Sequence, residues 1–318
     1  MFVNLKDRTL GTTHQCGEMY CRKCDKWGVD GEHKCFLKKP ELKPYEEHPK
    51  LIIFDYETAT TEEGRHVPCA VISQYIDGRE FRFPPDGVPM AGYNVNRRFC
   101  QWLFSEQHKE FTMIAHNFRS YDGQFVLEYM LDNGLKPDVI KNGTKLMDLR
   151  FDKLKMRARD TLNYMAMPLS ALPKALGLPT DLVSKGEFPH RANRPCKWDK
   201  FIPFPDVDQY MIEKRSKNDR REFAEWHTAE KARCGSVMDF RKVLMDYCFS
   251  DVTVIRKVVL KLRSDFRVLT KIDILEHVTI ASACRYFYAT SLMVPNEIAL
   301  ISAHGYQANR KTSLEATE

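Results

Sequence analysis

The sequence predicts an α/β fold, because apolar segments with strand character alternate with segments of helical periodicity. The run LIIF, residues 51–54, ends at two acids, Asp55 and Glu57, as a buried strand does when it reaches a surface. A second apolar segment, residues 111–115, leads into polar residues, and a long amphipathic stretch covers residues 238–262. Alternating strands and helices are typical of a sheet covered by helices.

The remaining elements fit the same fold class. Residues 67–76 and 80–83 have strand character, and residues 94–106 have the apolar spacing of a helix. Another helix opens at residues 121–123, so Asp122 lies near a strand–loop–helix junction, where α/β folds collect functional groups. A helix N-cap is the simpler role for this aspartate.

The composition is that of a globular chain with one large domain or two modest ones. Of the 318 residues, 43% are hydrophobic and 29% are charged, and the formal net charge is +6 at pH 7. There is no run of about 18 apolar residues, and residues 1–10 contain neither a signal core nor an amphipathic leader, so we expect an intracellular protein without a membrane span. Basic runs at residues 34–39 and 214–221 are compatible with a phosphate-binding surface or a solvated face.

Cysteines and histidines near the N-terminus form a separate pattern. Two close pairs of thiolate and imidazole ligands suit one tetrahedral zinc ion, and they are Cys21 with Cys24 and His33 with Cys35. The segment is too short and polar to fold around a core of its own. We therefore predict a small structural Zn²⁺ module at residues 1–39, with His14 or Cys16 as substitute ligands and a metal-free redox-sensitive loop as the alternative.

Acidic residues outside this module form a second candidate set. Asp55 and Glu57 point to the same face of a strand, and like charges so close repel unless a cation lies between them. Asp251 interrupts the apolar stripe of the long helix, with Tyr247 one turn earlier on the same side. Taken singly, a solvated acidic turn is the better explanation of Asp55 and Glu57, whereas the alternative for Asp251, an acid at the edge of the stripe, is weaker.

Taken together, Asp55, Glu57, Asp122 and Asp251 can hold two divalent cations about 3.5–4 Å apart, the arrangement that cleaves phosphodiesters. Carboxylate oxygens suit Mg²⁺ or Mn²⁺ better than Zn²⁺. One ion would activate a water molecule, and the other would stabilise the leaving 3′-oxygen.

At these motifs the chain resembles the 3′–5′ exonuclease domain of family B DNA polymerases, specifically the protein-primed group with its organellar and viral members. The segments DYET (55–58), HNFRSYDGQF (116–125) and YCFSD (247–251) are similar to its three exonuclease motifs. DTLNY (160–164) resembles its single-strand-binding segment, and KGEFPH (185–190) resembles its lysine motif. The resemblance covers nearly the whole chain, including the cysteine-rich front.

The resemblance implies an RNase H-like fold, a mixed sheet flanked by helices and preceded by the zinc module. It implies a linker at residues 40–50, an exonuclease domain at residues 51–265, and a helical junction toward a polymerase palm at residues 266–318. Motifs that resemble DxxSLYP and DTD of the palm do not occur, so we do not expect polymerase activity from this chain.

The resemblance also implies roles for individual residues. The catalytic set would be Asp55, Glu57, Asp122, Tyr247, Asp251 and Lys185, and the DNA contacts would be Thr58, His116, Asn117, Thr161 and Leu162. Asp55, Glu57 and Asp251 would hold the first ion, Asp55 and Asp122 would reach the second, and Tyr247 would orient the attacking water. A strand-end hydrogen bond is the alternative for His116, and a core position is favoured for Phe125 over base stacking.

The implied substrate is the single-stranded 3′ end of a primer-template DNA, and a terminal protein primer is a candidate partner. The implied location is the nucleus, the mitochondrion, or a viral or plasmid element. Two other functions use the same residues: a free-standing exonuclease that acts on RNA, and a zinc-bearing nucleic-acid-binding module with an inactive nuclease fold.

Overall fold

The computed structural model describes residues 18–21, 26–29, 35–43, 49–179 and 187–300. Contacts divide the chain into two units: residues 45–283 form one, and residues 1–44 together with 284–318 form the other. Among the described residues, no helix combines the length and the apolar character that a membrane crossing requires.

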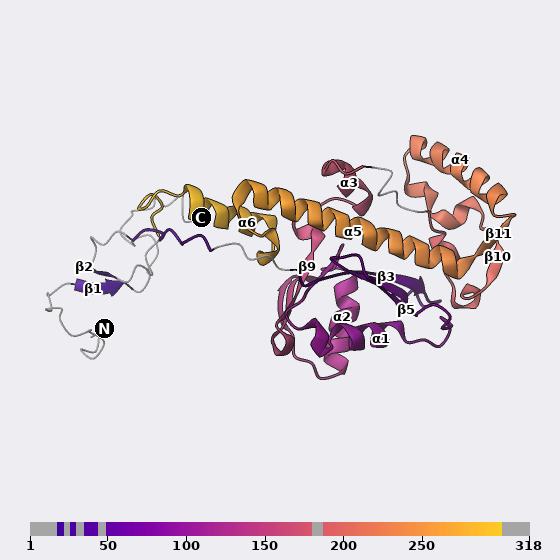
Figure 1. Ribbon diagram of the computed structural model, residues 1–318, viewed down its shortest axis with the longest axis horizontal. Coiled ribbons are helices and arrows are strands. Elements are labelled where there is room, and N and C mark those ends of the chain that lie inside the picture. Colours follow the sequence, from indigo (N-terminus) through magenta and orange to yellow (C-terminus); the bar gives the residue numbers. More distant parts are fainter. Residues whose placement is uncertain (1–17, 22–25, 30–34, 44–48, 180–186, 301–318) are drawn as a thin grey trace, which may run out of the picture. The chain divides into compact units, whose positions relative to one another are not determined.

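The unit of residues 45–283 is built on a seven-stranded mixed sheet (Figure 1). The strand order is β5-β4-β3-β6-β9-β8-β7, in which β6 runs parallel to both β3 and β9 and the other neighbouring pairs are antiparallel. The strands are β3 (Leu51–Thr60), β4 (His66–Tyr75), β5 (Glu80–Phe83), β6 (Thr112–Ala115), β7 (Asp138–Asn142), β8 (Lys145–Phe151) and β9 (Met156–Asp160).

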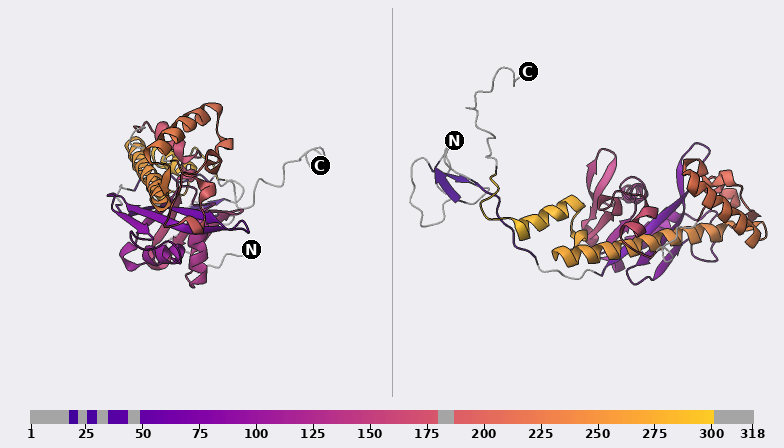
Figure 2. Two further views of the ribbon diagram at one scale, coloured as in Figure 1. Left: turned by 90° about the vertical axis from the view of Figure 1, so that its right-hand side faces the viewer. Right: turned by 90° about the horizontal axis from the view of Figure 1, so that it is seen from above.

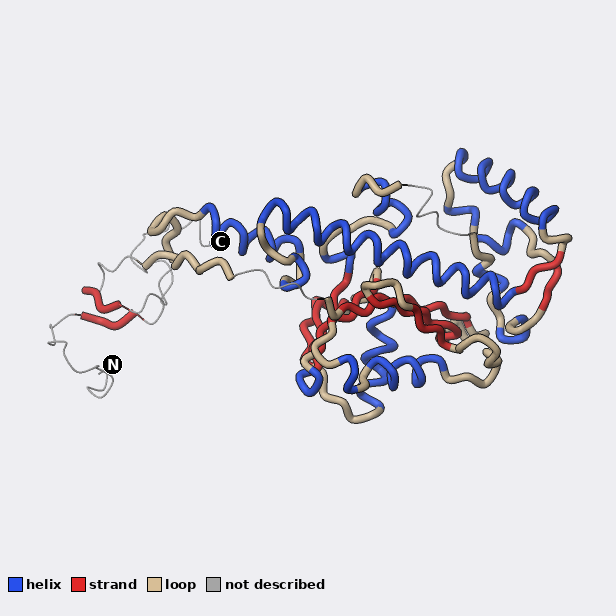
Figure 3. Tube along the Cα trace, viewed as in Figure 1, coloured by secondary structure: helices blue, strands red, loops and turns tan. Residues whose placement is uncertain are grey.

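Helices cover both faces of this sheet (Figures 2 and 3). Residues of β3 are therefore buried on both faces, which explains why the strand begins with a continuous apolar run. Leu51 and Ile53 belong to the core beneath α5 (Phe240–Thr270). Ile52 and Phe54 belong to the opposite core, which they share with α1 (Val95–Leu103) and α2 (Asp122–Asp132). The mixed sheet flanked by helices agrees with the predicted fold class.

The long helix α5 lies along one face of the sheet. The side chain of Asp239 caps its start by accepting the Lys242 N–H at 3.0 Å, and Lys271 ends it in a left-handed conformation, at φ 62°. The helix begins two residues later than the sequence predicts, because Val237–Asp239 form strand β11. It extends beyond residue 262 because no glycine or proline interrupts it.

Residues 169–239 add a smaller layer to this unit. It contains α3 (Leu172–Ala175), α4 (Lys217–Arg233) and the antiparallel pair of β10 (Phe201–Pro203) with β11. Short 3₁₀ turns join the elements of the unit: Glu106–His108, Asp152–Leu154, Thr161–Asn163, Leu169–Ala171, His190–Ala192, Pro195–Lys197, Val207–Tyr210, Ile212–Lys214 and Ile274–Glu276.

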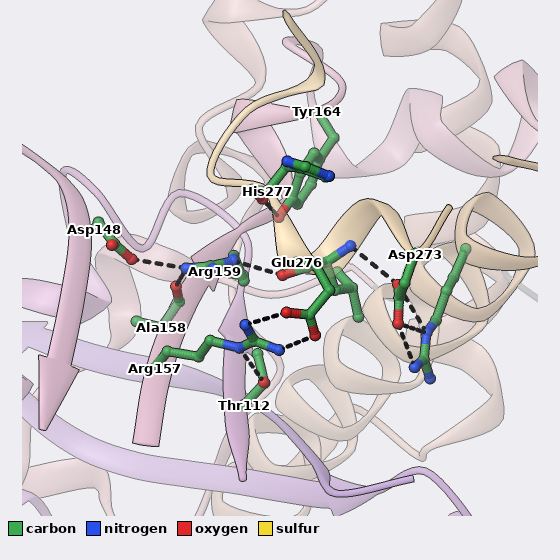
Figure 4. A network of polar contacts seen from close by, with 11 residues as sticks. Thr112, Asp148, Arg157, Ala158, Arg159, Tyr164, Asp273, Glu276 and His277 are labelled. Atoms are coloured by element: carbon green, nitrogen blue, oxygen red, sulfur yellow. Dashed lines mark hydrogen bonds and ion pairs between the residues drawn. The ribbon is translucent and has the colours of Figure 1, made fainter. Parts of the chain in front are cut away.

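A network of arginines and acids fastens the segment after α5 to the sheet (Figure 4). Arg159 of β9 binds Asp148 at 2.7 Å and the Leu275 carbonyl at 2.9 Å, and both charged side chains are buried. Arg157 pairs with Glu276, and Tyr164 donates its hydroxyl proton to the His277 carbonyl at 2.7 Å. A buried ion pair tolerates little displacement, so the network fixes this connection to the end of β9.

In the second unit, β1 (Glu18–Cys21) and β2 (Lys26–Val29) form an antiparallel pair. An isolated bridge joins Phe36 to Ala299, and the Leu37 N–H donates to the Ile298 carbonyl at 2.8 Å. α6 (Ile280–Phe287) begins in the first unit and ends in the second, and it continues as a π-helical turn, Tyr288–Leu292.

Candidate active site

The middle of β3 supplies two carboxylates to the face that α5 covers, because the strand continues to Thr60 and does not end at the acids as the sequence predicts. Asp55 and Glu57 have the parity of Leu51 and Ile53, so they continue the line of side chains that packs against this helix. Asp55 is half-buried, and Glu57 is buried at 8% exposure. A register shift between Glu57 and Thr58 ends the regular pairing with β4 directly after the second acid.

Helix α5 places Tyr247, Cys248 and Asp251 on its buried side, because Asp251 follows the other two by four and three residues, the spacing of one helical face. One ligand atom from each of Asp55, Glu57 and Cys248 lies within 4.8 Å of the others. The thiol of Cys248 also donates to the Asp55 backbone carbonyl at 3.4 Å. The third member of this closest group is thus a thiol that the sequence reasoning missed, although it directly follows Tyr247 in the same motif.

Asp251 meets the strand acids at two cavities. One has a volume of about 520 Å³ and is lined by Glu57, Tyr247 and Asp251 among others. The other, of about 620 Å³, is lined by Asp55 and Asp251 together with loop residues beyond β6 and β9. Asp251 therefore borders one cavity with Glu57 and the other with Asp55, and it is 4% exposed.

Asp122 lies at an open edge of β3. The parallel pairing of β3 with β6 ends at Ile53, which leaves the Tyr56 N–H without a strand partner on that side. Asp122, the first residue of α2, accepts this N–H at 3.0 Å. Tyr121 is the N-cap, so the N-cap role considered for Asp122 is wrong by one position.

Burial raises the pKa of Asp122 to about 7, and the nearby charge of Asp160 adds to the rise, while the hydrogen bond from Tyr56 opposes it. A divalent cation stabilises a carboxylate whose charged form is disfavoured by burial in this way.

Tyr247 is held by aromatic neighbours. Its ring lies 5.3 Å from that of Phe188 and 5.5 Å from that of His190, measured between centroids. Burial, followed by the charges of Asp251, Glu57 and Asp55, raises its pKa far above the usual value near 10. The hydroxyl therefore stays protonated at neutral pH and can act as a hydrogen-bond donor but not as a base.

The loops that follow β6 and β9 are tied together by Asp160, a residue that the sequence reasoning did not single out. Its carboxylate accepts the N–H groups of Asn117 at 3.0 Å, Arg119 at 2.8 Å and Leu162 at 2.8 Å. These bonds hold Asn117 in a left-handed conformation, at φ 67°. Asp160 is the last residue of β9 and caps the 3₁₀ turn that follows it.

The predicted DNA-contacting residues gather around this junction. The His116 ring bonds the Thr161 hydroxyl at 2.7 Å, and His116, Asn117 and Leu162 line the 620 Å³ cavity with Asp55. Thr58 lies apart from them, on the 520 Å³ cavity, where its hydroxyl bonds Tyr121. Phe125 packs against the core of α1 and α2, in agreement with the core position favoured for it.

Other predicted residues fall outside the described residues. Lys185 is one of them, and so are Cys24 and His33 of the zinc set. Cys35 is buried, and Cys21 ends β1. Directly after residue 186, Glu187 forms a double hydrogen bond with Arg215 at 2.7 and 2.5 Å, which anchors that end of the lysine motif.

The fold and this cluster define a class, an α/β domain with a carboxylate-lined candidate metal site. The chain belongs to the family of type B DNA polymerases of organellar and viral type, which matches residues 105–311. No curated protein matches the chain at a significant level.

Similar solved structures include phi29 DNA polymerase with primer-template DNA and incoming nucleotide substrates (14% identity, TM-score 0.44, 72% of this chain and 32% of that one). The same polymerase with single-stranded DNA matches at 15% identity and TM-score 0.43, over 69% of this chain and 32% of that one. The family B polymerase of the archaeon Pyrobaculum calidifontis matches at 14% identity and TM-score 0.42, over 76% of this chain and 29% of that one. The chain therefore spans about a third of the length of these polymerases.

Proposed function

We propose that this chain is a 3′–5′ exonuclease of RNase H-like fold that removes nucleotides from single-stranded DNA ends, as the proofreading part of a type B polymerase. One observation supports the proposal: Asp251 of α5 borders two cavities with the β3 acids, and Asp122 of α2 accepts the N–H of Tyr56, which lies between those two acids on β3. Family membership favours DNA as the substrate over other phosphodiesters.

The residues present fit two divalent cations. The donors are carboxylate oxygens, which suit Mg²⁺ or Mn²⁺, and the raised pKa of Asp122 reflects a buried acid in need of a counter-charge. Asp55, Glu57 and Asp251 would hold one ion, and Asp55 with Asp122 would reach the second. When bound, such ions lower the pKa of water and stabilise the leaving oxygen.

The chain's own residues orient the reactants. The protonated hydroxyl of Tyr247 would donate a hydrogen bond and so orient the oxygen that attacks the scissile phosphate. Thr161 and Leu162 would hold the single strand, and His116 and Asn117 would contact the terminal nucleotide from the loops that Asp160 fixes. Thr58 would also contact the DNA. Lys185 would neutralise phosphate charge.

The test uses 3′-labelled single-stranded DNA and RNA. Wild-type protein should release mononucleotides from DNA with Mg²⁺, and not with chelator or after Asp55→Ala with Glu57→Ala. Release from RNA at an equal rate would favour the free-standing ribonuclease. Absence of hydrolysis of either polymer, with binding retained, would favour the binding module.

The zinc module is also part of the proposal, with Cys21, Cys24, His33 and Cys35 as ligands. Metal analysis of the purified protein should find one zinc ion per chain, lost after His33→Ala with Cys35→Ala.

A terminal protein as primer, and an intracellular location at the site of organellar or viral DNA replication, are proposals that rest on the family alone.

A further inference from the structure

The 520 Å³ cavity has basic side chains that the proposed hydrolysis does not use. Its lining includes Glu57 and Asp251 and also His66, His190, Arg191 and Arg194. Acidic and basic groups therefore meet in one cavity, and the acids alone account for the metal chemistry.

The two arginines differ in their partners. Arg191 pairs with Glu213 at 2.6 Å and donates to the Asp208 carbonyl at 2.8 Å, so its charge is compensated. Arg194 donates one N–H to the Thr60 carbonyl at 2.6 Å, and no acid pairs with it among the residues that the structure describes. A guanidinium has five N–H donors in a fixed fork, which suits it to bind an anion such as phosphate.

The backbone beside Arg194 is fixed to the tip of β3. The buried side chain of Asn193 donates to the Thr58 carbonyl at 2.9 Å, and the Trp198 indole donates to the Asn193 amide oxygen at 2.8 Å. The position of Arg194 at the cavity is therefore built into the fold and does not depend on a flexible side chain alone.

Charge balance leaves this arginine in excess. With two divalent cations bound as proposed, four positive charges are matched by the four carboxylates of Asp55, Glu57, Asp122 and Asp251. The charge of Arg194 is then surplus, and a positive group in a cleft attracts an anion.

The position of Arg194 distinguishes this anion from the scissile phosphate. Its anchor, Thr60, is three residues beyond Glu57 on β3, about 10 Å away at a rise of about 3.3 Å per residue. The scissile phosphate has to lie at the carboxylates, so Arg194 is placed for a different phosphate of the terminal nucleotide.

We propose that Arg194 forms a subsite for a phosphate monoester on the terminal nucleotide, an inference that rests on the proposed nuclease function. This monoester is a 3′-terminal phosphate, because the 5′-phosphate of the released nucleotide is the scissile phosphate and lies at the carboxylates. The enzyme would then remove 3′-phosphorylated as well as 3′-hydroxyl nucleotides. The water oxygen bonds to the scissile phosphorus, the bond to the penultimate 3′-oxygen breaks, that oxygen takes a proton, and a nucleoside 3′,5′-bisphosphate leaves.

Binding of thymidine, thymidine 3′-monophosphate and thymidine 5′-monophosphate to the full chain with Mg²⁺ tests the subsite. Wild-type protein should bind thymidine 3′-monophosphate at least about fivefold more tightly than thymidine, as a charge-assisted contact implies. Arg194→Gln should reduce that preference to less than about twofold. Arg98→Gln, at an exposed position of α1, is the matched control and should keep it.

The preference is a ratio within one protein, so a partial loss of folded Arg194→Gln does not change it. Tighter binding of the 3′-monophosphate than of thymidine, reduced by Arg194→Gln, supports the subsite. A preference for the 5′-monophosphate alone places the bound phosphate at the carboxylates and overturns the proposal. Equal binding of all three compounds, no measurable binding, or an unchanged preference in Arg194→Gln overturns it. The binding assay involves no hydrolysis. If the protein prefers the 3′-monophosphate but does not hydrolyse DNA, the nuclease proposal is refuted and the phosphate subsite is not.

Discussion

Burial opposes the ionisation of Asp122, whereas the proposed metal site needs Asp122 as a charged carboxylate. The pKa rises from an ordinary value of 3.8 to about 7, so the folded state holds the proton more tightly than the unfolded state does. Without metal, this group therefore lowers stability as the pH rises from about 4 to above 7, by at most about 4 kcal/mol.

Asp122→Asn should remove this loss while it abolishes hydrolysis. The amide oxygen can still accept the Tyr56 N–H, but no charge is buried. In urea unfolding with chelator, we expect the stability of the variant relative to the wild type to rise by about 1–3 kcal/mol between pH 5 and pH 8. Asp132→Asn, exposed at the other end of α2, is the control. Equal pH dependence of wild type and Asp122→Asn would contradict this account.

Tyr247→Phe tests the role of a hydroxyl that stays protonated. Loss of an orienting hydrogen bond should lower kcat by about 10- to 100-fold, with the shape of the pH–rate profile unchanged. The measurement is kcat on single-stranded DNA between pH 6 and 10. A limb of the profile that disappears in the variant would mean that Tyr247 acts as a base.

The acidic residues of the candidate site could be predicted from the sequence, but most of the hydrogen bonds that position the site could not. Asp55, Glu57 and Asp251 stand out because an acid breaks an apolar pattern of known period. Local sequence does not show which distant N–H groups need an acceptor, so the role of Asp160 was missed. The same holds for Arg194, whose partner lies on β3.

At the scale of elements, the start of α2 has to approach the loop before it closely. A Cβ at Gly123 would lie 2.5 Å from the Phe118 carbonyl oxygen and 2.8 Å from its ring, closer than any real contact. Gly123 also donates its N–H to that carbonyl at 2.9 Å. Only glycine at this position lets the helix begin where Asp122 reaches the edge of β3.

Gly123→Ala should therefore cost about 1–3 kcal/mol in the free energy of unfolding, the usual range for overpacking. It should also lower kcat at temperatures where the protein remains folded, because Asp122 is displaced. Gln124→Ala, at the exposed next position, should change neither quantity appreciably. A loss of stability with full activity would show that Asp122 does not need this placement.

The bounds of β4, β5 and β6 were predicted to within one residue, whereas β3 and α5 extend several residues beyond the ends that the sequence predicts. The smaller layer of residues 169–239 was not predicted, because its short turns and the pair of β10 with β11 lack a repeating pattern and depend on packing. The order of the strands likewise depends on contacts between distant segments.

At the scale of the whole molecule, the described members of the candidate site all lie within residues 45–283. The core clusters on both faces of the sheet lie within the same unit. A chain of residues 45–283 should thus fold cooperatively and keep its Mg²⁺-dependent exonuclease activity within about threefold of the full chain. Thermal unfolding and hydrolysis of single-stranded DNA measure both properties. A folded but inactive fragment would show that the second unit contributes to the site.

Counting bound Mn²⁺ per chain tests the shared metal site most directly, by electron paramagnetic resonance or equilibrium dialysis. The wild type should bind two ions at the site, and Glu57→Gln and Asp251→Asn should each weaken or remove one of them, although the two residues lie far apart in the sequence. Asp132→Asn should leave the count unchanged. Wild-type stoichiometry and affinity in both Glu57→Gln and Asp251→Asn would contradict the claim that strand and helix hold the ions together.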